Sequence, residues 1–125
     1  MLMTGNDYKE SLRRYKPRVF IDGDRIESVV DEARLAPGIN AVAVTYDFAH
    51  DNRYRNLMTA TETVTSKIVN RMTHIDREPQ DLIEKLEATR LVCREVGCAQ
   101  RYLTHDALNA IHQATFAIDD AYSTD

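Results

Sequence analysis

The stretch that separates the two longest helical patterns of this chain reads Val96-Gly97-Cys98-Ala99-Gln100-Arg101-Tyr102-Leu103-Thr104-His105. Glycine commonly ends a helix because it adopts a left-handed backbone without strain. Before Gly97, a helix is predicted to begin at Pro79, and its apolar stripe comprises Leu82, Leu86, Cys93 and Val96. After Gly97, a second stripe with intervals of three and four residues comprises Leu108, Ile111, Thr115, Ile118 and Tyr122. We expect Thr104 to cap this second helix.

Shorter elements are predicted upstream of these helices. Thr4 and Asp7 favour a helix start, and Lys16-Pro17 ends that helix because the residue before a proline avoids the α-helical conformation. Residues 19–29 predict a β-hairpin that turns at Gly23-Asp24. A connector over 31–38 leads to a helix over 39–49 and a short helix over 51–58. Residues 59–65 favour an extended segment or a loop, and residues 67–75 carry mixed signals. The sequence thus predicts a mainly α fold with one small β-hairpin.

The composition indicates a single globular domain over residues 1–125. Hydrophobic residues make up 43% and charged residues 29%, close to the averages for soluble domains. A net charge of −4 and dispersed basic residues argue against nucleic acid as a partner. No apolar run approaches the ~20 residues of a membrane span, and no signal-peptide core follows Met1. Two cysteines are too few for a secreted disulfide framework, so we expect a cytoplasmic protein without a membrane partner.

Three candidate site residues follow Gly97. Cys98 and Tyr102 are four residues apart and His105 comes three later, so a continuous helix would place them on one face. A thiolate, a phenol and an imidazole in this arrangement could serve a metal or a bound organic cofactor. Structural interpretations also exist: Cys98 could pack as a small apolar residue, Tyr102 could anchor a helix end, and His105 could support a helix N-terminus.

Other reactive or charged residues are expected to be structural. Cys93 is predicted to pack as a small core residue, and His112 to lie hydrogen-bonded at the edge of the core. Arg101 is predicted to be a surface or interdomain ion-pair partner. Two acidic pairs are predicted to lie on solvated helix faces: Glu84 with Glu87, and Asp119 with Asp120.

Short motifs that share one order along the chain are Met1-Leu2-Met3-Thr4, Ser11-Leu12-Arg13, Arg18-Val19, Ile39-Asn40, Thr45-Tyr46, Leu57-Met58-Thr59, Asn70-Arg71, Gln100-Arg101, Asp106-Ala107, Asn109-Ala110 and Ile118-Asp119. On these motifs the chain resembles a flavoenzyme family that contains 4-hydroxybutyryl-CoA dehydratase and the 4-hydroxyphenylacetate 3-hydroxylases. It looks closer to the dehydratase.

This resemblance implies a helical N-terminal domain of the acyl-CoA dehydrogenase-like type. Family enzymes continue into a middle β-barrel and a C-terminal helical bundle, and FAD lies between these parts. Residues 1–125 would then be partial, because the barrel and the bundle are absent. Self-association or a second chain that supplies the missing domains would be needed, and an acyl-CoA or phenolic substrate would bind only in the completed enzyme. We expect the isolated chain to hold no cofactor.

The dehydratase relatives also hold a [4Fe–4S] cluster, and the resemblance places its first local cysteine at Cys98. The second local ligand falls on Tyr102, and the remaining cysteine and histidine ligands belong to the middle domain. Cys93 is five residues before Cys98 and on a helix would turn away from it. We therefore expect no cluster in this chain alone.

The hydroxylase relatives carry a Gly-Arg-x-Pro-x-Tyr pattern at this place. Gly97 and Tyr102 match it, whereas Cys98 replaces the arginine and Gln100 the proline. The resemblance therefore implies the N-terminal domain or split subunit of a 4-hydroxybutyryl-CoA dehydratase/vinylacetyl-CoA isomerase-like enzyme, inactive alone. One alternative is part of a two-component, FAD-dependent 4-hydroxyphenylacetate 3-monooxygenase-like enzyme. An alternative of another class is a non-catalytic helical interaction module.

Overall fold

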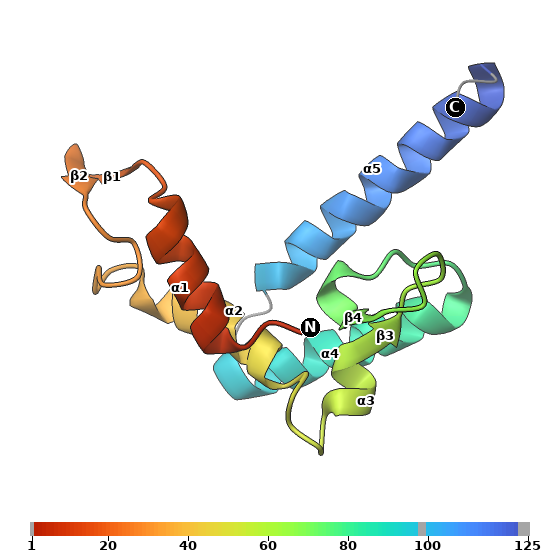
Figure 1. Cartoon of the computed structure of the whole chain (residues 1–125), viewed down its shortest axis with the longest axis horizontal. Helices are drawn as coiled ribbons and strands as arrows, with labels where there is room; N and C mark the ends of the chain where they lie inside the picture. The colour runs from red at the N-terminus through yellow and green to blue at the C-terminus, as the bar shows by residue number, and fades with distance from the viewer. Residues whose placement is uncertain (1, 98–99, 123–125) are drawn as a thin grey trace.

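The computed structural model describes residues 2–97 and 100–122 of the chain. Helices dominate these residues, together with two antiparallel strand pairs (Figure 1). The elements in order are α1 (Gly5–Tyr15), β1 (Val19–Ile21), β2 (Asp24–Ile26), α2 (Ala36–Asp47), α3 (Arg55–Met58), β3 (Thr59–Thr61), β4 (Ile68–Asn70), the 3₁₀ helix η1 (Arg71–Thr73), α4 (Pro79–Val96) and α5 (Gln100–Tyr122). The predicted mainly α fold is confirmed. Within the described residues, no helix combines the length and the apolar character needed to cross a bilayer.

Helix α1 forms as the sequence predicts. The Thr4 hydroxyl accepts a hydrogen bond from the Asp7 N–H at 3.1 Å, and the Asp7 carboxylate accepts one from the Thr4 N–H at 2.9 Å, which completes a capping box. Lys16 ends the helix with a left-handed φ of 44°. Gly5 lets α1 approach α2 closely, because a Cβ there would lie 2.6 Å from one carboxylate oxygen of Asp47. The other oxygen of Asp47 accepts a hydrogen bond from the Gly5 N–H at 2.7 Å.

The predicted hairpin is confirmed as β1 and β2, and a second hairpin is formed by β3 and β4. The first turns at Asp22-Gly23, one residue earlier than predicted, and both residues have the positive φ of a type I′ turn, 54° and 90°. In the second, the Glu62 carboxylate accepts hydrogen bonds from the N–H groups of Val64 and Thr65 and from the Thr65 hydroxyl. These bonds, the one from Val64 first, lower the pKa of Glu62 to about 2.

Three element boundaries differ from the prediction. Helix α2 begins at Ala36 rather than at 39, because Pro37 fits its first turn instead of ending the connector. Helix α3 is a single turn and covers only the end of the predicted 51–58 segment. Helix α5 begins at Gln100, so Thr104 lies inside it and does not cap it. Gly97 ends α4 with φ 69°, as the sequence predicts.

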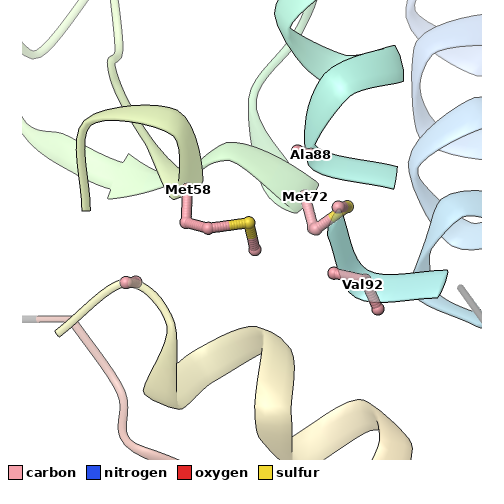
Figure 2. Packing of buried hydrophobic residues seen from close by; sticks show 5 residues of the cluster. Met58, Met72, Ala88 and Val92 are labelled. Atoms are coloured by element: carbon pink, nitrogen blue, oxygen red, sulfur yellow. The ribbon is translucent and has the colours of Figure 1, made fainter. Parts of the chain in front are cut away.

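The apolar core is small and lies where α3, η1 and α4 meet. Met58, Met72, Ala88 and Val92 are fully or almost fully buried there, and Ala49 closes the cluster from the end of α2. Figure 2 shows the two methionine side chains between α3, η1 and the turn of α4 that carries Val92. Methionine is flexible and fills irregular space, which suits a core built from short elements.

The predicted apolar stripes of α4 and α5 are not the core. Helix α4 buries Lys85, Ala88 and Val92, whereas Leu82 and Leu86 are 48% and 41% exposed. On α5, the residues Leu108, Ile111, Ile118 and Tyr122 are 40–77% exposed. Figure 1 shows the C-terminal part of α5 running away from the other elements. Most of both stripes thus faces outward, although Val96 at the end of α4 packs against the core.

Candidate functional site

The inner face of α5 is polar. Arg101, His105 and Asn109 recur every four residues and therefore lie on one side of the helix. Their side chains hydrogen-bond to Thr45 of α2, to the His74 carbonyl after η1, and to the Asp76 N–H before α4, respectively. These long-range hydrogen bonds, rather than an apolar seam, position α5 on the rest of the chain.

His105 is completely buried beneath this face. Its Nε2 lies 2.6 Å from the His74 carbonyl oxygen, so this nitrogen carries the proton and donates. Nε2 also lies 3.5 Å from an oxygen of Asp76. Burial lowers the pKa of His105 and outweighs the opposing effects of the His74 carbonyl and Asp76. The neutral imidazole of His105 joins α5 to the segment after η1 and so positions the helix. The predicted catalytic role of His105 stays a prediction.

Tyr102 lies one turn earlier, half-buried beside a buried ion-pair cluster. The ammonium of Lys85 is 5.5 Å from the centre of the Tyr102 ring, 2.8 Å from a carboxylate oxygen of Asp106 and 3.1 Å from one of Asp76. Hydrogen bonding from Lys85, and secondarily from Tyr102, lowers the pKa of Asp106. Burial opposes the charge on Lys85, but the hydrogen bonds to Asp106 and Asp76 outweigh it and raise the pKa of Lys85. The phenol of Tyr102 is thus held next to charged groups, at the place where the sequence predicted a site.

Arg101 is buried, with 8% of its surface exposed, so the prediction of a surface ion pair is wrong, and an interdomain ion pair stays a prediction. Its Nη1 donates to the Thr45 hydroxyl at 2.8 Å, and its guanidinium carbon lies 4.1 Å from the centre of the Tyr46 ring. Burial lowers the pKa of Arg101, and the neighbouring Tyr46 and Tyr8 offset this only in part. No carboxylate pairs with Arg101 among the residues that the structure describes.

Arg71 is a second buried arginine, which the sequence analysis missed. It donates to the carbonyl oxygens of Leu57 and Thr59 at 2.6 and 2.7 Å, and it pairs with Glu84 at 2.6 Å. Glu84 is therefore half-buried and paired, not part of a solvated face. Arg71 lies in a segment with mixed signals, and Lys85 lies on a helix beside an apolar stripe that predicts a different buried face. Most partners of the two cations come from distant segments, so no local pattern in the sequence identifies these cations as buried.

A hollow of about 830 Å³ opens beside the first turn of α5. Arg101 and Tyr46 form one wall, and Asn70, Lys67 and Arg55 are among the residues around it. Tyr102 and His105 are not among the lining residues, so neither of these two predicted site residues opens onto the hollow.

Of the two cysteines, only Cys93 can be placed in the structure, and the described residues form no metal site around it. Cys98 lies outside the described residues, and Cys93 is exposed, so its interpretation as a core residue is wrong; α4 turns Val92 inward and the next residue outward. No group of three or more His, Cys, Asp or Glu side chains that could hold a metal ion occurs in the described part of the chain. Tyr102, at the second ligand position, is a phenol beside Lys85, and iron–sulfur clusters are held by thiolates. These residues do not fit a [4Fe–4S] cluster.

Comparison with known proteins identifies the family to which the chain belongs. Residues 4–125 match the model described as 4-hydroxyphenylacetate 3-hydroxylase N terminal. The chain is 39% identical over 125 residues to 4-hydroxybutyryl-CoA dehydratase/vinylacetyl-CoA-Delta-isomerase from Clostridium aminobutyricum, a match that covers 99% of this chain and 26% of that protein.

Two solved structures extend the comparison. An oxygen-tolerant archaeal 4-hydroxybutyryl-CoA dehydratase from N. maritimus matches with a TM-score of 0.91 and 37% identity, covering 100% of this chain and 25% of that one. The oxygenase component HpaB of 4-hydroxyphenylacetate 3-monooxygenase, complexed with FAD and 4-hydroxyphenylacetate, matches with a TM-score of 0.62 and 25% identity over 74% of this chain and 19% of that one. The chain thus spans about a quarter of the length of its dehydratase relatives. It belongs to the 4-hydroxyphenylacetate 3-hydroxylase N-terminal family, with greater similarity to the dehydratase than to the hydroxylase.

Proposed function

We propose that residues 1–125 act as the N-terminal helical domain of a flavin-dependent enzyme of the 4-hydroxybutyryl-CoA dehydratase/vinylacetyl-CoA isomerase type. The observation that supports this most strongly is the TM-score of 0.91 over the entire chain. A middle barrel and a C-terminal bundle, supplied by further polypeptide, would complete the enzyme. We also propose the cytoplasm as its compartment, on the low cysteine content of the sequence.

The outward-facing apolar side chains support an assembly of this kind. The exposed set on α4 and α5 comprises Leu82, Ile83, Leu86, Leu103, Leu108, Ile111, Phe116 and Ile118. Large exposed apolar side chains in such number mark surfaces that another protein segment covers. A completing domain or a second copy of the chain would bury them.

In the completed enzyme, Tyr102 and Cys98 would lie toward the substrate, and His105 would hold α5 in place from below. FAD, when bound, supplies the redox chemistry of the family. The Tyr102 hydroxyl donates its proton to Asp106, and Lys85 lies beside its ring, so the phenol oxygen would be held in place to accept a hydrogen bond from a substrate hydroxyl. No step is assigned to an iron–sulfur cluster, since the donor set does not fit one.

That mismatch favours a second candidate, a part of a 4-hydroxyphenylacetate 3-monooxygenase-like enzyme. Tyr102 occupies the tyrosine position of the hydroxylase pattern, and such an enzyme needs no cluster. The lower identity and TM-score of the hydroxylase match keep this candidate second. A non-catalytic helical module would keep the fold and the interface but show no turnover.

Co-expression with a chain that carries the family's barrel and bundle tests the proposal. We expect a stable complex that binds FAD and turns over 4-hydroxybutyryl-CoA, whereas turnover of 4-hydroxyphenylacetate with reduced flavin would favour the second candidate. Tyr102→Phe should lower kcat, and Tyr15→Phe, a matched change at an exposed tyrosine of α1, should not. A complex that forms without flavin or turnover would support the non-catalytic module and contradict the enzyme proposal.

A further inference from the structure

The hollow beside Arg101 carries an excess of positive charge. Arg55, Lys67 and Arg101 line it, and none of its lining residues is Asp or Glu. None of the three cations forms a salt bridge within the described part of the chain. Like charges around one cavity repel each other, so an anion inside it would be attracted by all three.

Arg101 is held as a fixed anchor at the wall of this hollow. Thr45 accepts its hydrogen bond at 2.8 Å and in turn donates to the Val42 carbonyl at 2.7 Å, which fixes the hydroxyl. Tyr46 stacks against the guanidinium. A buried cation without a counter-ion is costly, and a guanidinium has five donors, of which one is used by a protein acceptor among the described residues. The remaining donors are available to a ligand that approaches through the hollow.

We propose that this hollow binds the phosphoryl groups of a nucleotide-type ligand. Three cations exceed the charge of a single carboxylate, whereas a diphosphate carries more than one negative charge and offers oxygens to several donors at once. The planar guanidinium of Arg101 suits two phosphoryl oxygens, and Arg55 and Lys67 are exposed and long enough to adapt to the rest. Pyrophosphate binding to this chain is measured without FAD and without a second domain, so its outcome is independent of whether the chain completes a flavoenzyme.

Calorimetric titration of the 125-residue chain with inorganic pyrophosphate at low salt tests this site. Combining Arg55→Gln with Lys67→Gln should weaken binding at least tenfold, because two charge-assisted contacts are lost. Arg18→Gln combined with Arg25→Gln, a matched loss of two exposed cations outside the lining, should change the affinity less than twofold. Arg101→Gln should abolish binding, with its helical circular dichroism recorded to show that the fold is kept. Equal pyrophosphate affinity in the double variant and in the parent would overturn the proposal.

Parallel titrations identify the source of the phosphoryl groups. Tighter binding of coenzyme A than of FAD would assign the site to an acyl-CoA, and the reverse order would assign it to the flavin nucleotide; both results support a phosphoryl site. Acetate at the same ionic strength should not compete. If acetate binds as tightly as pyrophosphate, the hollow is a carboxylate site and the proposal is wrong.

Discussion

Removing the charge of Lys85 should destabilise this fold by about 3 kcal/mol. The Lys85 side chain is 4% exposed, and its two carboxylate partners differ, since Asp76 is 19% and Asp106 44% exposed. In Lys85→Met the apolar stem stays packed, but Asp76 loses its cation. One oxygen of Asp76 already lacks a hydrogen bond, so the carboxylate would remain nearly buried and unpaired. Breaking a buried ion pair in this way costs about 3–5 kcal/mol, and the residual exposure of Asp76 places the value at the lower end.

Urea and thermal unfolding followed by circular dichroism at pH 7 measure this loss. For a chain of 125 residues, 3 kcal/mol corresponds to a fall in Tm of about 12 °C. Asp106→Asn, which breaks the more exposed contact, should cost less than about 1 kcal/mol. Adding Asp76→Asn to Lys85→Met should recover part of the loss, because no unpaired charge then remains. The reasoning is refuted if Lys85→Met costs less than 1 kcal/mol, or if Asp106→Asn costs as much as Lys85→Met.

Three further predictions follow from burial and exposure. Burial lowers the pKa of His105, so below about pH 6.5 the unfolded chain binds a proton that the folded chain does not. The free energy of unfolding should therefore be greatest above about pH 6.5 and fall as the pH drops below it. Urea midpoints across pH 5–7.5 should fall less in His105→Gln than in the parent. Cys93→Ala should change the free energy of unfolding by less than about 0.5 kcal/mol, while Val92→Ala at the adjacent buried position should cost about 2 kcal/mol in the same assay, and equal effects would contradict the assigned faces of α4. The purified chain should self-associate, bind an apolar dye and carry neither FAD nor iron. A monomer that binds no dye would contradict the exposed apolar surface. A yellow protein would contradict the absence of FAD, and a brown protein with about four irons per chain would contradict the absence of a cluster.

Local signals predicted the elements of this fold well. The helix cap at Thr4, the helix start at Pro79 and the stop at Gly97 depend on neighbouring residues, and all three are confirmed. The β3–β4 hairpin was not predicted, because its turn depends on how the Glu62 side chain bonds to backbone groups two and three residues later. Hydrogen bonds of that kind compete with regular structure and leave no periodic pattern.

The candidate site was predicted only in part. The spacing would place Tyr102 and His105 on one face of a helix if the helix were continuous, and α5 contains both, although the predicted cap at Thr104 is wrong. The spacing does not reveal the partners that decide what each side chain does. Lys85 meets Asp106 across 21 residues and Arg101 meets Thr45 across 56, so tertiary packing alone brings them together. Composition and periodicity report which faces are apolar, whereas the charge partners of a buried cation depend on the packing of whole helices.

Helix α5 reverses the usual amphipathic arrangement, and this explains why the sequence predicted its helical structure but not the residues that it buries. Its docking side is polar, with Arg101, His105 and Asn109 satisfied by specific acceptors and donors, so the helix is positioned by hydrogen bonds. Its apolar residues, among them Ile111 and Phe116, are more than half exposed. Covering four such side chains would contribute on the order of 5 kcal/mol, as much as the whole stability of a small domain. The polar side of α5 thus holds the helix on the rest of the chain, and its exposed apolar residues are available to the completing segment proposed above.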